Sequence, residues 1–132
     1  MKTILVFLIA SASYATAYCQ TADDYYNRGN LKHDLQEYRG AMADYSKAIE
    51  LNPNSVKAYN NRGVLKRDLQ DYRGAIADYN KAIEVDPNYT SAYNNRGNSK
   101  HDLQDDRGAI ADYSKAIELN PNYADAYHNE GS

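Results

Sequence analysis

Hydrophobic residues recur at the spacing of an α-helix in two successive segments, over about residues 57–69 and 73–86. The first segment has one apolar stripe and one polar stripe. The apolar stripe consists of Ala58, Tyr59, Gly63, Leu65 and Leu69. The second segment has one apolar face, made of Ala75, Ile76, Tyr79, Ala82 and Ile83. Because Pro87 cannot continue helical hydrogen bonding, the pattern predicts two helices, the second of which ends just before this proline.

This pair of helical patterns repeats every 34 residues. Shifting the chain by that interval aligns residues 22–55 with 56–89 and 90–123, and residues 124–132 begin a fourth copy. The second and third copies are identical at 25 of 34 positions, so both helices belong to one repeated unit. A period near 34 that contains two helices is typical of a solenoid built from helix-turn-helix repeats.

Small and large residues alternate where the predicted helices must approach each other closely. Glycine recurs in the first helix, at Gly29, Gly63, Gly97 and Gly131. In the second helix, tyrosines stand between pairs of alanines, at Tyr45, Tyr79 and Tyr113. The alanines are Ala41, Ala75 and Ala109 before the tyrosine and Ala48, Ala82 and Ala116 after it. Such alternation lets facing side chains interdigitate at the density of a protein interior, so we expect these positions to form the core.

The repeated residues resemble the signature of the tetratricopeptide-repeat family, an aromatic residue, Leu-Gly, Tyr, Ala-x3-aromatic and Pro. Here that signature reads Tyr59, Gly63, Ala75, Tyr79 and Pro87, and it recurs in all three copies. The resemblance implies an all-α fold over residues 22–132, a right-handed superhelical solenoid of helix-turn-helix repeats. It also implies that the first helices of the repeats form a concave face.

Charged residues depart from the family signature at two places on the apolar stripe. Arginine stands where the family favours Leu, at Arg28, Arg62 and Arg96, and lysine where it favours Tyr, at Lys32, Lys66 and Lys100. We expect their apolar stems to pack on the neighbouring helix with the charges led to the edge. The expected partners of the arginines are Asp44, Asp78 and Asp112. An exposed pair of this kind contributes about 1 kcal/mol or less.

Under this resemblance the polar stripe of the first helices becomes the concave face, and it is the candidate peptide-binding groove. Its candidate residues are Tyr26, Asn27, Asn30, His33, Lys57, Asn60, Asn61, Val64, Arg67, Asn94, Asn95, Asn98 and His101. Several of these positions differ between copies while the packing positions repeat. A surface that contacts a ligand would show this contrast, and so would exposed positions that drift freely.

One asparagine recurs per repeat on this stripe, at Asn27, Asn61, Asn95 and Asn129. An amide carries a donor and an acceptor, so a row of amides can pair with an extended peptide backbone, as similar rows do in peptide-binding members of the family. Neighbouring helices of the same chain could equally satisfy these amides.

A subset of the family clamps the C-terminal carboxylate of chaperone peptides with two lysines, two asparagines and an arginine. Asn30 and Asn61 match the two asparagines of this pattern, but none of its three basic positions holds a lysine or an arginine here. Tyr26, Ser91 and Asn95 stand there instead. The sequence therefore does not favour that ligand.

Charge and motifs exclude several classes of function. The chain has 15 Lys and Arg against 18 Asp and Glu, mixed along its length, which does not favour nucleic acid or an anionic membrane as partner. It has no glycine-rich phosphate loop and no nucleophile motif. Because Arg67 occupies the equivalent position between His33 and His101, we expect no shared metal there.

We therefore expect a non-catalytic protein-interaction module, without cofactor or metal, that binds an extended peptide or protein segment in its groove. The alternative is a structural or assembly component that associates through its convex face or its open C-terminal end.

Residues 1–19 have the layout of a signal peptide, with Lys2, the apolar run Ile4–Ala10 and small residues after it. The run is shorter than the ~20 residues that a membrane-spanning helix needs. We expect cleavage after Cys19 rather than after Ala17, and export to the periplasm or the extracellular space. A lipid on the Cys19 sulfur is a weaker alternative, because Tyr18 and not a small residue precedes it.

The C-terminal end of the array is weakened in sequence. In the third copy Ser99 replaces Leu and Asp106 replaces Tyr, and residues 124–132 are too short for a full capping helix. Loss of a large buried side chain costs about 2–5 kcal/mol, so we expect this end to open first. Three causes fit this weakening: a truncated chain, self-association through the exposed end, or a frayed terminus.

Overall fold

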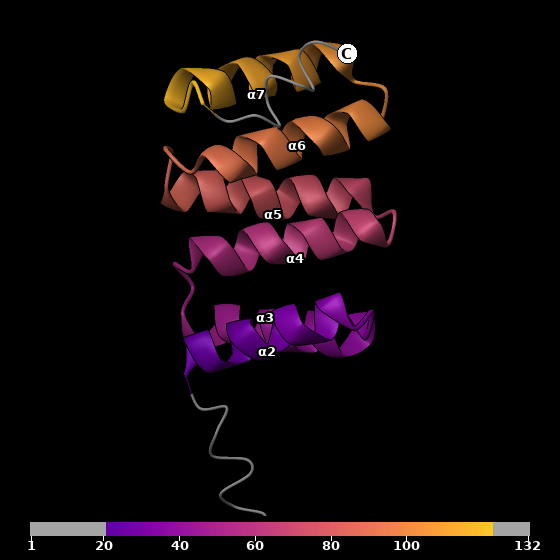
Figure 1. Cartoon of the computed structure of the whole chain (residues 1–132), viewed down its shortest axis with the longest axis vertical. Helices are drawn as coiled ribbons and strands as arrows, with labels where there is room; N and C mark the ends of the chain where they lie inside the picture. The colour runs from indigo at the N-terminus through magenta and orange to yellow at the C-terminus, as the bar shows by residue number, and fades with distance from the viewer. Residues whose placement is uncertain (1–20, 123–132) are drawn as a thin grey trace, which may run out of the picture.

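The computed structural model describes residues 21–122, which form six α-helices and no strand (Figure 1). The helices are α2 (Ala22–Asp34), α3 (Tyr38–Leu51), α4 (Val56–Asp68), α5 (Tyr72–Val85), α6 (Thr90–Asp102) and α7 (Asp106–Leu119). The two helices predicted in the second repeat are found as α4 and α5, each one residue earlier than expected. The predicted signal segment with Cys19, and the start of the fourth repeat with Asn129 and Gly131, lie outside the described residues.

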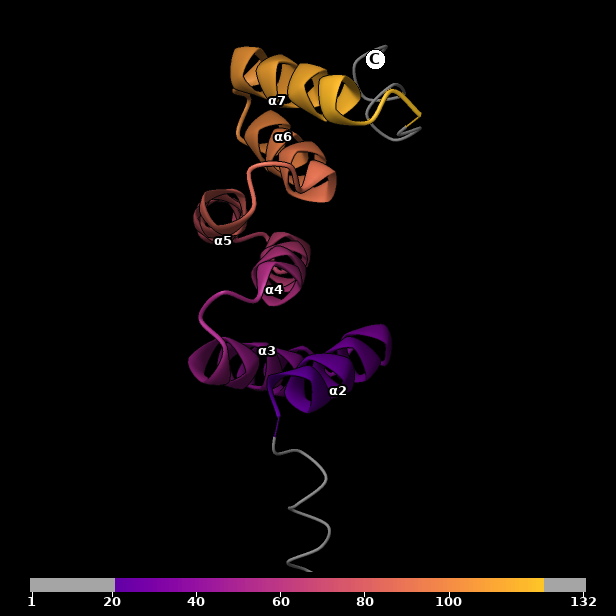
Figure 2. The ribbon, with the colours of Figure 1, turned by 90° about the vertical axis from the view of Figure 1, so that its left-hand side faces the viewer.

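The helices pack as a stack of hairpins. Each first helix packs on the second helix of its own repeat, and α3 packs on α4 as α5 does on α6. The first helices also contact one another, α2 with α4 and α4 with α6, whereas between residues 21 and 122 no second helix contacts the next one. The stack therefore curves with the first helices on its inner side (Figure 2). The predicted all-α solenoid is confirmed.

The core follows the alternation of small and large residues along the chain. Tyr45 and Tyr79 are fully buried and Tyr113 nearly so, each between two buried alanines of its helix. Gly63 lies against Tyr79 so closely that a Cβ atom added there would be 2.5 Å from Cε1 of the ring. Gly29 and Gly97 meet Tyr45 and Tyr113 in the same way, so the recurring glycines let the two helices of a hairpin approach.

The turns within the hairpins use glutamine where a left-handed backbone is required. Gln36, Gln70 and Gln104 have φ of 60°, 64° and 65°, a conformation that costs an L-residue with a side chain about 1–2 kcal/mol. The turn compensates by satisfying carbonyls at the helix end: the Asp71 N–H donates to the Lys66 carbonyl and the Gln70 N–H to that of Arg67, both at 2.8 Å. In the next helix, the Asp71 side chain accepts from the Gly74 N–H at 3.0 Å.

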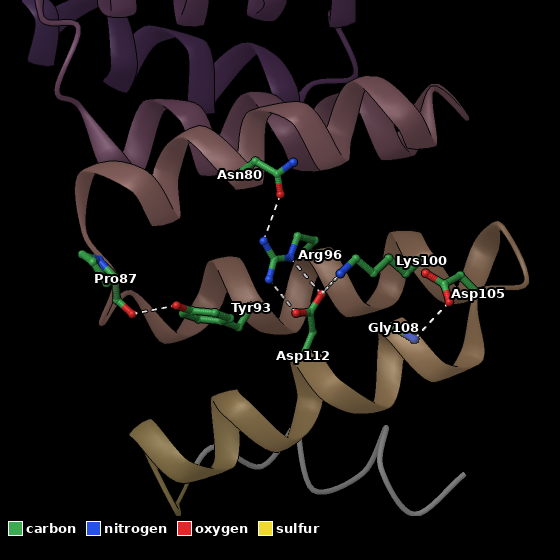
Figure 3. A network of polar contacts seen from close by, with 8 residues as sticks. All are labelled: Asn80, Pro87, Tyr93, Arg96, Lys100, Asp105, Gly108 and Asp112. Carbon is green, nitrogen blue, oxygen red and sulfur yellow. Dashed lines mark hydrogen bonds and ion pairs between the residues drawn. The ribbon is translucent and has the colours of Figure 1, made fainter.

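A buried aspartate in each hairpin holds two cations. Both Asp78 oxygens accept hydrogen bonds from Arg62 at 2.8 Å, and Lys66 Nζ lies 3.0 Å from Oδ2. The equivalent cluster of Asp112, Arg96 and Lys100 is shown in Figure 3. The predicted arginine–aspartate pairs are confirmed. No partner was predicted for the lysines, but the lysine in each repeat binds the same buried carboxylate, while 22–28% of its side chain stays exposed.

These clusters also join neighbouring hairpins. Arg62 Nη1 donates to Ser46 Oγ of the preceding hairpin at 3.2 Å, and Arg96 Nη1 donates to Asn80 Oδ1 at 2.9 Å (Figure 3). In the first hairpin, burial acts to raise the pKa of Asp44, but the hydrogen bonds and charges of Arg28 and Lys32 outweigh it and hold that pKa below its ordinary value. The carboxylate is therefore held in its charged form.

None of the helices between residues 21 and 122 combines the length and the apolar character needed to cross a membrane.

Candidate functional site

The candidate residues lie on α2, α4 and α6, and we call their common surface the first-helix face. Asn27, Lys57 and His101 are exposed, whereas Asn60 and Asn94 are buried. The other candidates are half-buried: Tyr26, Asn30, His33, Asn61, Val64, Arg67, Asn95 and Asn98. The face therefore offers a ligand mainly partly covered polar groups, which hydrogen bonds between helices hold in place.

The amides of the first-helix face bond from one repeat to the preceding one. Asn61 Nδ2 donates to Tyr26 Oη at 3.0 Å and to Asn30 Oδ1 at 2.9 Å. Asn95 Nδ2 donates to Asn60 Oδ1 at 3.0 Å. The row of asparagines is thus partly satisfied by neighbouring helices, the alternative that the sequence left open. Asn27 makes no side-chain hydrogen bond with any residue between 21 and 122.

Ionisable side chains cross the same junctions. Arg67 Nε lies 2.5 Å from Asp102 Oδ2, and at the equivalent place in the first repeat His33 Nε2 lies 2.6 Å from Asp68 Oδ2. Lys57 Nζ lies 2.9 Å from Asp23 Oδ1. The hydrogen bond to Asp102 raises the pKa of Arg67, which stays charged.

Sequence reasoning missed these pairs between repeats. The signal that could have found them is charge complementarity between repeats, at a spacing of 35 residues for His33–Asp68 and Arg67–Asp102 and of 34 residues for Asp23–Lys57.

Every lysine and arginine of the three first helices is bound to a carboxylate. Lys57 and Arg67 bind across repeats, and the others bind the buried aspartates. Those others are Arg28, Lys32, Arg62, Lys66, Arg96 and Lys100. Four aspartates of the same helices belong to the polar stripe beside the candidate residues: Asp23, Asp34, Asp68 and Asp102. Together with the two cations Lys57 and Arg67 they give the first-helix face a net charge of 2 − 4 = −2 with neutral histidines. The face is therefore acidic.

The two histidines predicted not to share a metal each contact a carboxylate. His33 lies beside Asp68, and His101 Nδ1 lies 2.8 Å from Asp106 Oδ1. Between residues 21 and 122, no three His, Cys, Asp or Glu side chains are placed to hold a metal ion together.

The hydroxyl groups of the three core tyrosines have different neighbours on the first helices. Tyr45 Oη donates to Asn30 Oδ1 at 2.7 Å, and Tyr113 Oη donates to Asn98 Oδ1 at 2.6 Å. At Tyr79 the equivalent position is Val64, which cannot accept a hydrogen bond. The Tyr79 hydroxyl consequently has no hydrogen-bond partner of good geometry within residues 21–122, and the buried Ser99 hydroxyl, which interacts with it weakly, also lacks one. Burial raises the pKa of this phenol well above its ordinary value.

Removing the tyrosine hydroxyl should therefore have different effects at two equivalent positions. We expect Tyr45→Phe to lower the free energy of unfolding by about 1 kcal/mol, because it removes the hydrogen bond to Asn30. Tyr79→Phe should be neutral or stabilising, because it removes a buried hydroxyl that lacks such a bond. Urea denaturation of both variants measures the difference, and equal losses would contradict the assignment of partners.

Comparison with known families agrees with the repeat pattern. The model described as "Tetratricopeptide repeat" matches residues 56–89 and 90–123, and the model described as "TPR repeat" matches residues 29–66. The chain belongs to the tetratricopeptide-repeat family. The matched residues extend from residue 29, within α2, into the residues after α7, so this tetratricopeptide-repeat protein carries the family's motif in all three hairpins. No curated protein matches the sequence closely enough to suggest a relative.

Solved structures share this fold. The first TPR domain of Spaghetti (RPAP3), bound to the HSP90 peptide SRMEEVD, is 28% identical with a TM-score of 0.82, over 86% of this chain and 90% of that one. The Arabidopsis OM64 TPR domain is 27% identical with a TM-score of 0.82, over 84% and 92%. YrrB, described as a TPR protein with an unusual peptide-binding site, is 23% identical with a TM-score of 0.80, over 86% of this chain and 58% of YrrB. The likeness to YrrB concerns the fold alone.

Proposed function

We propose that this protein is a non-catalytic interaction module that binds an extended peptide or protein segment along the first-helix face. A TPR domain of the same fold, similar over 86% of this chain, has been solved with a bound peptide. The contacts between α2, α4 and α6 make this face the inner side of the stack, where one extended segment can touch all three repeats. The fold likeness supports the binding mode, and the chemistry of the face indicates the ligand.

Hydrogen bonds within the protein fix the orientation of side-chain amides on this face. Asn61 uses both hydrogens of its side-chain amide on Tyr26 and Asn30, so its orientation is fixed before any ligand arrives. Its Oδ1 atom accepts only a long bond of 3.4 Å from Asn60. An oriented oxygen with spare acceptor capacity can receive a peptide N–H, and fixing it in advance lowers the entropy cost of binding.

The observation that decides the ligand class is that all cations of the first helices are already bound to carboxylates. The face offers mainly oxygen acceptors and has a net negative charge, so it favours a ligand rich in donors. We infer that the ligand is a neutral or basic extended peptide. An acidic C-terminal peptide would meet acceptors and carboxylates, and such like-charge contacts cost several kcal/mol.

A library of random linear peptides displayed on phage, selected on the immobilised protein, tests this function. We expect enriched peptides that are neutral or basic, whereas synthetic SRMEEVD should show no saturable binding in calorimetry. Asn27→Ala and Val64→Lys, both on the first-helix face, should each weaken an enriched peptide about tenfold or more. Arg73→Ala, an exposed change on α5, is the matched control and should leave affinity unchanged.

The proposal fails if no peptide is enriched, or if Arg73→Ala weakens binding as much as the face variants do. Tight binding of SRMEEVD would overturn the inferred ligand class and leave the module itself standing.

We also propose that residues 1–19 direct export to the periplasm or the extracellular space and are then removed. The support is the order of Lys2, the apolar run Ile4–Ala10 and the small residues that follow. Amino-terminal sequencing of protein from its native host should begin at Gln20 or Tyr18. A sequence that begins at Met1 or Lys2 would contradict export with cleavage.

A further inference from the structure

The α2 end of the stack exposes a leucine that is buried in the next repeat. Leu31 is 59% exposed, whereas its equivalent Leu65 is 0% exposed. Leu65 packs with Ala41 and Tyr45 of the preceding hairpin, and Met42 covers the same cluster. Leu31 therefore occupies the position that docks a first helix onto a preceding second helix, and between residues 21 and 122 no helix precedes it.

The α7 end exposes the opposite half of the same junction. Ile110 is 54% exposed, and it is the equivalent of Met42, which packs in the cluster around Leu65. Its other equivalent, Ile76, is half-buried where α6 follows α5. Helices α2 and α7 lie at the two ends of the stack (Figures 1 and 2). The two ends are thus complementary in the way that α4 and α3 are complementary within the chain.

The α2 end also has the polar arrangement of an internal first helix. The Arg28 guanidinium carbon lies 5.3 Å from the centre of the Tyr25 ring, as Arg62 lies 5.9 Å from Tyr59. The same pair recurs in the third repeat between Arg96 and Tyr93 at 5.5 Å. Helices α4 and α6, which pack on a preceding second helix, carry this pair within the helix, and α2 carries it too.

We propose that the α2 end of one copy docks onto the α7 end of a second copy, so that Leu31 enters the surface beside Ile110 as Leu65 enters the cluster of Ala41 and Tyr45 that Met42 covers. The two surfaces in contact differ, so the contact is head-to-tail. One copy of the dimer keeps an unpaired α2 end, and the other keeps an unpaired α7 end. Such a contact does not close on itself and can add further copies. It leaves the first-helix face unoccupied, so it is independent of the proposed peptide binding.

Complementary variants provide the test. Sedimentation velocity of the full chain should show association that increases with concentration, and Leu31→Glu or Ile110→Glu should each weaken it about thirtyfold or more. An equal mixture of the two variants should form dimers and no larger species, because one intact α2 end and one intact α7 end remain. Leu69→Glu is the matched control, since Leu69 is 48% exposed at the C-cap of α4 within the stack and its equivalents Leu35 and Leu103 are also exposed.

Several outcomes would overturn the proposal: a wild-type chain that stays monomeric, dimers that survive both glutamate variants, or a mixture that stays monomeric. Circular dichroism of each variant confirms that it is folded. The same series without residues 1–19 separates this contact from association through the apolar run Ile4–Ala10. Val64→Lys should leave self-association unchanged while it weakens peptide binding, so failure of one proposal can be told from failure of the other.

Discussion

Asp78→Asn should lower the free energy of unfolding by about 3 kcal/mol. The Asp78 side chain is 6% exposed and receives two hydrogen bonds from Arg62 and a third contact from Lys66. The neutral amide would leave two neighbouring cations without their carboxylate, and breaking a buried pair by removing one partner costs about 3–5 kcal/mol. We place the loss at the lower end because the cations keep partial access to water. Urea denaturation measures it.

Glu84→Gln is the matched control on the same helix. Glu84 pairs with Lys81 at 3.3 Å, but its side chain is 70% exposed, so removing its charge should change stability by less than about 0.5 kcal/mol. A double-mutant cycle of Asp78→Asn with Arg62→Leu should show coupling of about 1 kcal/mol or more. Equal effects of Asp78→Asn and Glu84→Gln, or no coupling, would show that the buried cluster does not stabilise the hairpin.

Gly63→Ala should destabilise the protein by about 2 kcal/mol, although alanine is the better helix former by about 1 kcal/mol. The new Cβ atom would lie 2.5 Å from Cε1 of Tyr79, a ring that is fully buried and cannot turn away. Overpacking of this kind costs about 1–3 kcal/mol, and more where a backbone must shift. Thermal and urea unfolding of the variant would show the loss.

Gly40→Ala provides the comparison, because the Cβ atom there would lie 2.9 Å from Cδ of Lys32, an aliphatic chain that can shift while its Nζ keeps the contact with Asp44. We expect a change within about 0.5 kcal/mol. If Gly63→Ala were tolerated as well as Gly40→Ala, the close approach of α4 and α5 would not depend on this glycine.

The fold could be predicted because its determinants are local and repeated. The spacing of apolar residues, the proline after the second helix and the alternation of glycine with tyrosine all recur at one interval, so each copy supports the interpretation of the others. The arginine–aspartate pairs could also be predicted, since they lie within one hairpin. The contact of Lys66 with Asp78 was missed because the sequence does not show that both cations reach one carboxylate.

The contacts between repeats were not predicted, because their offset along the sequence depends on how far one hairpin turns relative to the next. That rotation brings Arg67 to Asp102 rather than to a residue exactly one repeat away. It also buries Asn60 and Asn94, which the helical period alone places on the open face. The left-handed backbone conformation at Gln70 was not predicted either, since glutamine has no preference for that conformation.

Chemical-shift mapping by NMR tests peptide binding on the first-helix face most directly, since it shows which residues of the protein a peptide contacts. An enriched neutral or basic peptide would be titrated into isotope-labelled protein while the backbone and the side-chain amides are observed. We predict that the resonances that shift belong to α2, α4 and α6, with the side-chain amides of Asn27, Asn61 and Asn95 among them. Shifts confined to α3, α5 and α7 would contradict peptide binding on the first-helix face.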